Sequence, residues 1–436
     1  MTYDIIIGRD VSDKERFGDS GLIYIGKGYV KMGNYTSLSN KIWMDIARSH
    51  VILIAGKRGS GKSYTIGAIA EELANLEDEV SKNISSLIFD TMGIFWTMKY
   101  KNEKDKELLD EWELKPKKLP AKVFVPFGKE KEYKEIGVPF DAKFALKTSE
   151  LDAEDWITLF NLEMTSSPGV LISRIITKLK ESEENYIIEE IERAVMEDNK
   201  SSKDTKEIVS ALFSAADSWG VFAKTSQGTE IKDLITPGAT TVLDVSVYSS
   251  IGAFNVRALV ISLISRKLFE NRMDARKKEE LESLQSGQDY LSYKTERKEP
   301  LVWIFIDEAH EFLPKDGKTP ATDALVQLLR EGRQPGISLV LATQQPGQIH
   351  KDVMTQSDII ISHRVTAKPD IEALNEIMQS YLLKNIQQQI DDLPALKGSA
   401  IILDDNSERI YPIRVRPRFT WHGGEAPSAV KVDVKL

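Results

Sequence analysis

Residues 56–63 read GKRGSGKS, which has the glycine, lysine and serine spacing of a phosphate-binding loop. The loop follows the apolar run VILIA and precedes a helical pattern of apolar residues, the context that such a loop needs. Its backbone N–H groups and Lys62 contact phosphates, the Ser63 hydroxyl binds Mg²⁺, and the following helix adds its N-terminal dipole. The stretch therefore predicts a nucleoside triphosphate site. Its expected binding residues are Gly56, Arg58, Gly59, Ser60, Gly61, Lys62, Ser63 and Tyr64.

A second stretch, LVWIFIDEAH at 301–310, reads as a buried strand that ends in two acids. In a nucleotide site of this kind, an Asp at the strand end holds the Mg²⁺ shell and a following Glu polarises the attacking water. We therefore expect Asp307, with Ser63, at the metal and Glu308 as the catalytic acid. The alternative is an acidic pair that merely ends a strand. Because the Glu would polarise an attacking water molecule, the pair favours a hydrolase over a kinase.

Polar residues further along complete the candidate site. A helix is predicted to begin at Thr319-Pro320, and Arg330 and Arg333 lie near its C-terminal end. These arginines either complement the helix dipole or supply a charge in trans to the γ-phosphate of a neighbouring subunit, which requires a ring. The strand ISLVLATQQP ends at Gln344, which either contacts the γ-phosphate or water, or caps the strand.

The elements that position these residues alternate between strands and helices after about residue 45. Near-continuous apolar runs are typical of strands covered on both faces, so we expect an α/β fold with a mostly parallel, doubly wound sheet. Short β-like pieces before residue 45 predict a small N-terminal β region. The expected strands are Tyr3–Ile7, Leu22–Ile25, Tyr29–Met32, Val51–Ala55, Ser86–Asp90, Lys122–Val125, Thr241–Asp244, Val302–Ile306, Ser338–Ala342, Asp358–Ile361 and Ala400–Leu403.

A long section at about 145–235 has helical patterns and no convincing strand, which predicts a helical subdomain inserted into the sheet domain. The charged section Met273–Pro300 is interpreted either as a solvated excursion between a helix and a strand or as a contact with a partner or DNA. The helical patterns of the insertion lie at Ala153–Leu162, Val170–Leu179, Ile187–Val195 and Ile208–Phe213.

Composition narrows the class of protein. The chain has 436 residues, of which 41% are hydrophobic and 29% charged, the balance of a soluble globular protein. The absence of cysteine excludes disulfides and thiolate metal sites. A net charge of −9 argues against a surface that coats nucleic acid nonspecifically, although it leaves room for a basic channel. With no apparent signal peptide or long apolar run, we expect a cytoplasmic protein without a membrane contact.

The motifs GKRGSGKS, IDEAHEFL, LREGRQPGISLVLATQQP and VRPRFTWHGG together resemble the HerA/FtsK superfamily of P-loop motor ATPases, and HerA more closely than FtsK. The resemblance covers mainly residues 48–95 and 300–424. It implies a RecA-like P-loop NTPase core that binds ATP and Mg²⁺ and forms a homo-hexamer around double-stranded DNA. Such proteins often act beside a NurA-type nuclease in DNA end processing and repair.

The resemblance also implies roles for individual residues. It places Lys62 on phosphate, Glu308 at the catalytic acid position, Arg333 as the trans-acting arginine and Gln344 as the sensor. Further residues that it places near the nucleotide or the subunit boundary are Arg364, Arg416, Arg418 and His422. The sequence departs from the family after the second strand, where it reads Asp90-Thr91-Met92-Gly93-Ile94 and lacks the family's second acid. The β region before the P-loop is also short for a full HerA barrel.

The expected function is an ATP-hydrolysing ring that translocates on or unwinds double-stranded DNA. Two alternatives stay open: a nucleotide-dependent scaffold that gates a nuclease or defence effector, and a DNA-packaging or conjugation motor. Lys99, Lys101 and Lys104 are candidates for DNA contacts, although charged loops are usually only solvated. The expected segments are 1–47 (β region), 48–144 and 236–412 (ATPase core), 145–235 (helical insertion) and 413–436 (C-terminal arm).

Overall fold

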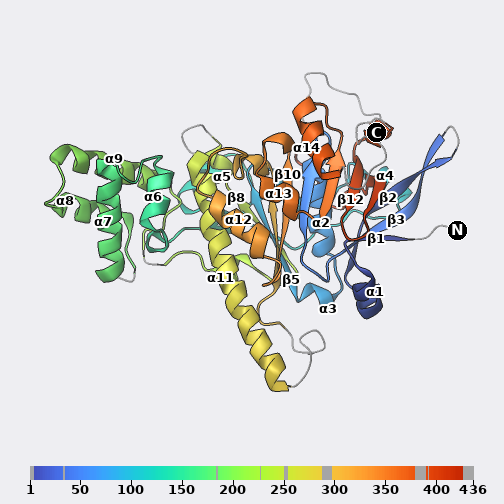
Figure 1. Cartoon of the computed structure of the whole chain (residues 1–436), viewed down its shortest axis with the longest axis horizontal. Helices are drawn as coiled ribbons and strands as arrows, with labels where there is room; N and C mark the ends of the chain where they lie inside the picture. The colour runs from blue at the N-terminus through green and yellow to red at the C-terminus, as the bar shows by residue number, and fades with distance from the viewer. Residues whose placement is uncertain are drawn as a thin grey trace.

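A 13-stranded mixed sheet forms the centre of the computed structural model (Figure 1). The structure describes residues 4–32, 35–182, 185–225, 227–249, 254–286, 297–378, 389–390 and 392–425. The strand order is β1-β3-β2-β13-β12-β11-β4-β10-β9-β5-β8-β6-β7. Non-consecutive neighbours in this order mean that the chain crosses over repeatedly, as a doubly wound sheet requires.

Eight neighbouring strands of this sheet run parallel, from β11 to β7. The predicted α/β fold with a mostly parallel sheet is therefore confirmed, and Val51–Ala55 was predicted with its observed bounds. The eight strands are β4 (Val51–Ala55), β5 (Ile84–Asp90), β6 (Ala121–Pro126), β7 (Ala142–Phe144), β8 (Thr240–Asp244), β9 (Leu301–Ile306), β10 (Ile337–Thr343) and β11 (Ile359–His363).

The rest of the sheet is mainly antiparallel and joins the N-terminal strands to the C-terminal ones. The two pieces predicted at 22–25 and 29–32 are one strand, and β3, β7 and β13 were not predicted. The strands β12 (Ser399–Asp404), β13 (Arg409–Val415), β2 (Leu22–Met32) and β3 (Tyr35–Asp45) lead to the edge strand β1 (Ile5–Ile7). The N-terminal β region thus continues the same sheet.

Both faces of the parallel sheet are buried, and β4 shows how. Ile52 and Ile54 point into one apolar core, which includes Ile66 and Ile69 of helix α2 (Lys62–Leu73). Their neighbours along β4 point into a second core with helices α11 (Phe254–Ser286) and α12 (Thr322–Glu331). Because side chains alternate along a strand, a run that is apolar at every position fits a sheet covered on both sides.

The section 145–235 contributes helices that stand apart from the sheet, at the left of Figure 1. Their buried side chains belong to the same apolar core as α11 and α12. The helices are α6 (Ala153–Leu159), α7 (Ser167–Ser182), α8 (Ile188–Glu197), α9 (Lys203–Ser218) and α10 (Ile231–Leu234). The division of the chain into five segments stays a prediction. The boundary predicted at 413 falls inside β13.

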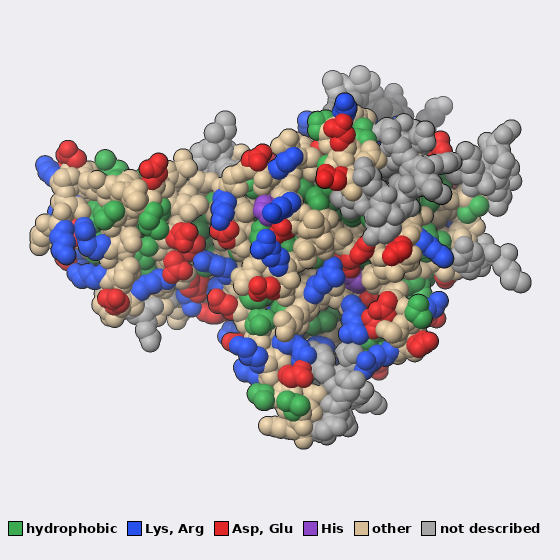
Figure 2. All heavy atoms as spheres, viewed as in Figure 1, with side chains coloured by type: hydrophobic (Ala, Val, Ile, Leu, Met, Phe, Trp, Pro, Cys, Tyr) green, Lys and Arg blue, Asp and Glu red, His purple; other side chains and the backbone are tan. Residues whose placement is uncertain are grey.

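Helix α11 extends beyond the sheet and carries the first part of the charged section 273–300, while residues 287–296 of that section lie outside the described residues. On the face drawn in Figure 2, basic and acidic side chains intermix, and hydrophobic side chains lie at the tip of α11, where Leu281 and Leu284 are exposed. None of the helices described has the length and apolar character needed to cross a membrane.

Short helices complete the fold. Helix α12 begins at Thr322 and not at the predicted Thr319-Pro320, because the hydroxyls of Thr319 and Thr322 both bond to the Phe312 carbonyl and hold the intervening residues as a turn. The remaining α-helices are α1 (Val11–Phe17), α3 (Asp78–Ser81), α4 (Lys106–Glu111), α5 (Glu130–Glu135), α13 (Lys351–Gln356) and α14 (Lys368–Met378).

Candidate nucleotide-binding site

The register of the sheet brings the predicted site residues to one edge. Thr343 pairs with Ala55, and Leu341 pairs with Ile306. The residues that follow β4, β9 and β10 therefore leave the sheet side by side at its carboxyl edge, where ligands bind in open α/β sheets. The P-loop, the acidic pair and Gln344 are in this way brought together.

The P-loop is shaped to accept phosphate. Gly59 and Gly61 have φ values of +73° and +116°, a backbone region that favours glycine. A Cβ added at Gly56 would lie 2.4 Å from the Ser60 hydroxyl oxygen, so the loop closes tightly on itself. That hydroxyl is buried and has no hydrogen-bond partner among the described residues. An orphaned donor inside the loop fits a site that a phosphate oxygen would complete.

Lys62 is buried at the start of α2, and its Nζ lies 3.4 Å from the Lys57 carbonyl oxygen. Burial lowers the pKa of Lys62, and the nearby carboxylates of Glu308 and Asp307 act in the opposite direction. The charged ammonium is therefore costly in this site until it meets another anion. A phosphate in the loop would supply that anion.

Ser63 and Asp307 meet as predicted. The Ser63 hydroxyl donates to Asp307 Oδ2 at 2.5 Å, and the Glu308 N–H donates to Asp307 Oδ1 at 2.9 Å. Burial and then the charge of Glu308 raise the pKa of Asp307, while Ser63 and Lys62 act against the rise. One hydroxyl and one carboxylate suit Mg²⁺, which is usually bound by one or two carboxylates together with substrate phosphates. Among the described residues, no cluster of three or more His, Asp or Glu side chains is placed to hold a metal ion.

Glu308 adopts an unusual backbone conformation, with φ of +52° in the left-handed region. This turn directs its carboxylate toward β10, where Gln344 Nε2 donates to Glu308 Oε1. The other oxygen, Oε2, is buried, lies 3.6 Å from His310 Nδ1, and has no hydrogen-bond donor among the described residues. Strained backbone is typical of functional sites, and an oxygen without a donor is free to accept one from a water molecule.

Sequence reasoning missed two histidines at this site. His310 lies 3.1 Å from the Thr343 hydroxyl, beside Glu308, the predicted catalytic acid. His363, at the end of β11, lies under the P-loop and contacts Thr65. His310 lies within the motif IDEAHEFL, but no role was predicted for it beside the two acids. The one available signal for His363 was its place just after the strand predicted at Asp358–Ile361.

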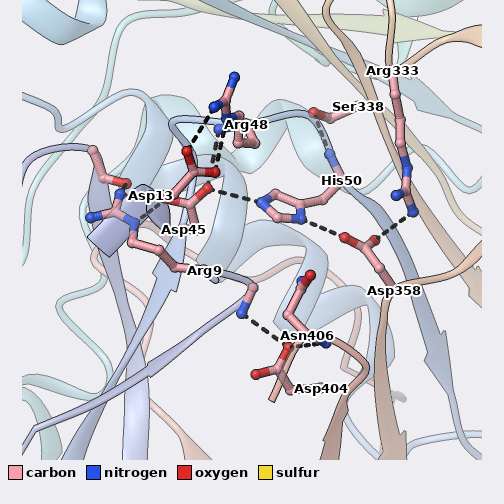
Figure 3. A network of polar contacts seen from close by, with 12 residues as sticks. Arg9, Asp13, Asp45, Arg48, His50, Arg333, Ser338, Asp358, Asp404 and Asn406 are labelled. Atoms are coloured by element: carbon pink, nitrogen blue, oxygen red, sulfur yellow. Dashed lines mark hydrogen bonds and ion pairs between the residues drawn. The ribbon is translucent and has the colours of Figure 1, made fainter. Parts of the chain in front are cut away.

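Arg333 lies near the amino ends of the parallel strands, whereas the P-loop follows the carboxyl end of β4. It belongs to the polar network of Figure 3. It donates to the Gln356 carbonyl at 3.0 Å and pairs with Asp358 Oδ1 at 3.3 Å. The same oxygen accepts from the N–H of Val51, the first residue of β4, at 2.8 Å. His50 belongs to the same network. Burial acts to lower the pKa of His50, but hydrogen bonds to Asp358 and Asp45 outweigh it and raise that pKa to about 9. Arg333 is therefore tethered to a charged network on its own subunit.

The C-terminal arginines lie in the interior and not at the nucleotide site, which differs from the expectation. Arg416 and Arg418 are fully buried and pair with Glu71 of α2 at 3.1 and 3.0 Å. Arg418 also lies 3.2 Å from His422, and its N–H donates to the Tyr64 hydroxyl at 2.7 Å. These contacts hold the C-terminal segment on α2, so the guanidinium groups have no free edge for a phosphate or a neighbouring subunit. Tyr64 likewise packs on this segment and not on the phosphate side of the loop.

Arg364 and Arg58 remain near the P-loop. Arg364 accepts a hydrogen bond at its carbonyl from Lys57 N–H at 2.9 Å, and its side chain lines a cavity of about 140 Å³ with Gly59 and Ser60. Arg58 is exposed at the tip of the loop. Both are placed to approach a bound nucleotide, and their contacts with it stay a prediction.

The lysines considered for DNA contact are partly engaged within the chain. Lys99 donates to Asp141 at 2.5 Å, and Lys104 pairs with Glu425. Lys101 is exposed and bridges to Thr420 through its backbone. A role for them on DNA stays a prediction.

The family model described as "Helicase HerA, central domain" matches residues 30–268, more than half of the chain and including the P-loop. The chain belongs to the HerA helicase central-domain family. A second model, "Zonular occludens toxin (Zot)", matches residues 253–368, which include the acidic pair and Arg364. HerA membership agrees with the resemblance drawn from the motifs and identifies the site as that of a P-loop ATPase.

Individual HerA relatives match over parts of their length. The DNA double-strand break repair helicase HerA of Pyrococcus furiosus is 28% identical over 184 residues, 39% of this chain and 31% of that protein. The protein of the same description from Sulfurisphaera tokodaii is 22% identical over 385 residues, 86% of this chain and 67% of that protein. The match to the Pyrococcus protein thus spans about a third of that relative.

Two solved structures share the fold. VirB4 of Thermoanaerobacter pseudethanolicus aligns with a TM-score of 0.59 over 92% of this chain and 97% of that chain, at 13% identity. The bacterial conjugative coupling protein TrwBdeltaN70 aligns with a TM-score of 0.51 over 86% of this chain and 87% of that chain, also at 13% identity. At this identity, the likeness shows the fold alone.

Proposed function

We propose that this HerA-family chain is an ATPase that hydrolyses ATP to ADP and phosphate and uses the energy to move along double-stranded DNA as a ring. One observation carries the proposal: Ser63, Asp307, Glu308 and Gln344 converge on the P-loop at the carboxyl edge of the sheet. The HerA family match and the curated descriptions of its relatives as DNA repair helicases support DNA as the second ligand.

Each residue has a defined task in this proposal. The P-loop N–H groups and Lys62 hold the phosphates, and Lys62 balances the charge that develops on the β- and γ-phosphate oxygens. Ser63 and Asp307 would hold Mg²⁺, which would neutralise charge on the phosphates. Glu308 accepts a hydrogen bond from the attacking water through Oε2, the oxygen that lacks a donor. Gln344 fixes the direction of that carboxylate.

The position of Arg333 meets one requirement of a trans-acting arginine. Arg333 bonds to Asp358 and Gln356 at the edge of the sheet where β4 begins, whereas the P-loop follows the end of β4. At a rise of about 3.3 Å per residue, the strand separates these two places by roughly 13 Å. Arg333 therefore lies far from the phosphate site of its own subunit. An arginine that acts in trans contacts the phosphate of a neighbouring subunit, so it must lie away from its own phosphate site.

ATP turnover by the parent, with and without double-stranded DNA, tests the proposal. We expect ATP hydrolysis that rises with added duplex and that Lys62→Ala abolishes together with tight nucleotide binding. Glu308→Gln is expected to bind ATP and retain it, because the shape and Asp307 are kept while the carboxylate that orients water is lost.

The scaffold alternative makes a different prediction. If hydrolysis gates a nuclease partner and does not drive movement, duplex DNA leaves the ATPase rate unchanged while nucleotide controls binding of the nuclease. Parent-like turnover in Glu308→Gln would show that another group activates water.

A further inference from the structure

His363 is fully buried directly beneath the P-loop. The β11–β4 register pairs Ser362 with Ala55, which puts His363 beside Gly56, the first glycine of the loop. A Cβ added at Gly56 would lie 2.7 Å from the His363 Cβ, and one added at Gly61 would lie 3.5 Å from its Cε1. Both fixed glycines of the loop therefore rest against this one side chain.

The hydrogen bonds of His363 define its protonation. Nδ1 lies 3.0 Å from the Ser399 carbonyl oxygen, which only accepts, so Nδ1 carries the hydrogen. Burial first, and then the positive charge of Lys62, lower the pKa of His363 to about 4, while the Ser399 bond opposes this. The ring is neutral at ordinary pH, and Nε2 is left as an acceptor.

That acceptor meets α2, the helix that begins at the P-loop. The Thr65 hydroxyl lies 2.9 Å from His363 Nε2. The same hydroxyl also lies 3.1 Å from the Gly61 carbonyl oxygen, which accepts the Thr65 N–H at 2.9 Å. Because Nε2 of the neutral ring carries no hydrogen, a hydrogen bond to His363 takes the hydroxyl hydrogen of Thr65, while Gly61 keeps the Thr65 N–H. His363 thus joins three parts of the site: the floor of the loop, the first turn of α2, and Ser399 at the start of β12.

We propose that His363 is a positioning residue of the ATPase, whose neutral ring braces the P-loop from below and fixes it in its phosphate-binding shape. This inference rests on the proposed function, because it deepens the same site. His363 touches neither substrate nor metal in this proposal. It acts by removing alternative loop conformations that nucleotide binding would otherwise have to suppress.

Two conservative substitutions separate the bonds of His363. Asn places a polar atom near the position of Nδ1, so His363→Asn keeps the tie to Ser399 and loses the reach to Thr65. Gln places one near the position of Nε2, so His363→Gln keeps the contact with Thr65 and loses Ser399. Thr65→Val removes the hydroxyl that contacts His363 Nε2 and keeps nearly the same side-chain shape.

The measurement is binding of a fluorescent methylanthraniloyl ATP to the full chain, with ATPase kinetics at saturating ATP. We expect His363→Asn and Thr65→Val each to weaken binding roughly tenfold, since each leaves a buried polar group unpaired. His363→Gln should stay closer to the parent. The His363→Asn/Thr65→Val pair should lose no more than either single change. The rate constant kcat should change much less than KM, which a general loss of folding would not produce.

Parent-like affinity in His363→Asn, or fully additive losses in the double variant, would overturn the inference. Thr65→Val keeps His363 and so gives a result even if His363→Asn does not fold. Lys62→Ala distinguishes a failure of the role proposed for His363 from a failure of the proposed function. One outcome contradicts only the role of His363: the parent binds the probe, Lys62→Ala does not, and both His363→Asn and Thr65→Val bind it as the parent does. If the parent fails to bind the probe, the proposed function itself falls.

Discussion

Gln344, the residue after β10, donates a hydrogen bond to the carboxylate of Glu308, which follows β9. The contact links the ends of two neighbouring strands over the phosphate site. It occupies one oxygen of Glu308 and leaves the other without a donor among the described residues. If Gln344 is the proposed sensor, a γ-phosphate that attracts its amide would change the direction of the Glu308 carboxylate.

Replacing Gln344 by Ala should lower kcat by a factor on the order of 10², the scale of losing one preorganised hydrogen-bond donor at a reacting centre. Nucleotide affinity should change little, because the P-loop and Lys62 are untouched. Gln345 is the matched control, since it is the adjacent residue of the same type and is exposed. Equal kcat values for Gln344→Ala and Gln345→Ala would show that the contact only caps the strand.

Mixed rings test whether Arg333 acts in trans. A subunit with Arg333→Ala should keep its own ATP binding and fail to activate its neighbour, because an arginine finger contributes roughly 10³–10⁵ in rate. Mixing it with Lys62→Ala subunits should restore some ATPase activity at interfaces that combine an intact P-loop with an intact arginine.

Arg330→Ala provides the control for this experiment. Arg330 lies at the same helix end, is exposed, and pairs with Asp352 at 2.6 Å, so its loss should leave activity near the parent level. No recovery at any mixing ratio, once subunit exchange has been confirmed, would leave Arg333 as a cation that serves only its own network.

Glu71 should be a major contributor to stability. It is fully buried and pairs with both Arg416 and Arg418. Removing it leaves the buried Arg418 without its carboxylate and Arg416 with only Glu72, which lies 2.9 Å from its Nε. Breaking a buried ion pair by removing one partner typically costs about 3–5 kcal/mol. Urea unfolding should show this loss for Glu71→Ala and a change below about 0.5 kcal/mol for the exposed Glu79→Ala. Similar midpoints for the two variants would contradict the role given to the network.

The acids at the ends of β5 and β8 should make stability depend on pH. Burial, and then the charge of Asp244, raise the pKa of Asp90 from 3.8 to about 7. A raised pKa in the folded state means that the free energy of unfolding is highest below pH 4 from this group and falls as the pH rises toward 7. Asp244→Asn removes the neighbouring charge and should flatten that fall between pH 4 and 7, as measured by urea unfolding. Identical slopes in parent and variant would show that the two carboxyls do not interact.

Much of the fold and site follows from local sequence. The apolar runs of the central parallel strands, buried on both faces, predicted those strands within a few residues, and the glycine spacing located the P-loop. Strand β13 was missed because it alternates polar and apolar residues and contains Pro412, as suits an antiparallel strand near solvent. Strand β3 was missed although Gly33-Asn34, which stands between β2 and β3, is a dipeptide typical of hairpin turns.

Motif resemblance was less informative about side-chain direction. It associated Arg416 and Arg418 with the nucleotide, yet their partner Glu71 lies more than 340 residues away in the sequence. The role of His363 was missed for the same reason, since its contacts with Thr65 and Ser399 depend on the order of strands in the sheet. Such pairings are set by topology and not by local pattern.

ATP-dependent displacement of a third strand from a DNA triplex is the direct test of movement along DNA, because an enzyme that moves along duplex must remove that strand. We expect displacement that requires ATP, is abolished by Lys62→Ala and Glu308→Gln, and is reduced by salt as phosphate contacts are lost. ATP hydrolysis by the parent without any displacement, on duplex that it binds, would contradict movement along DNA.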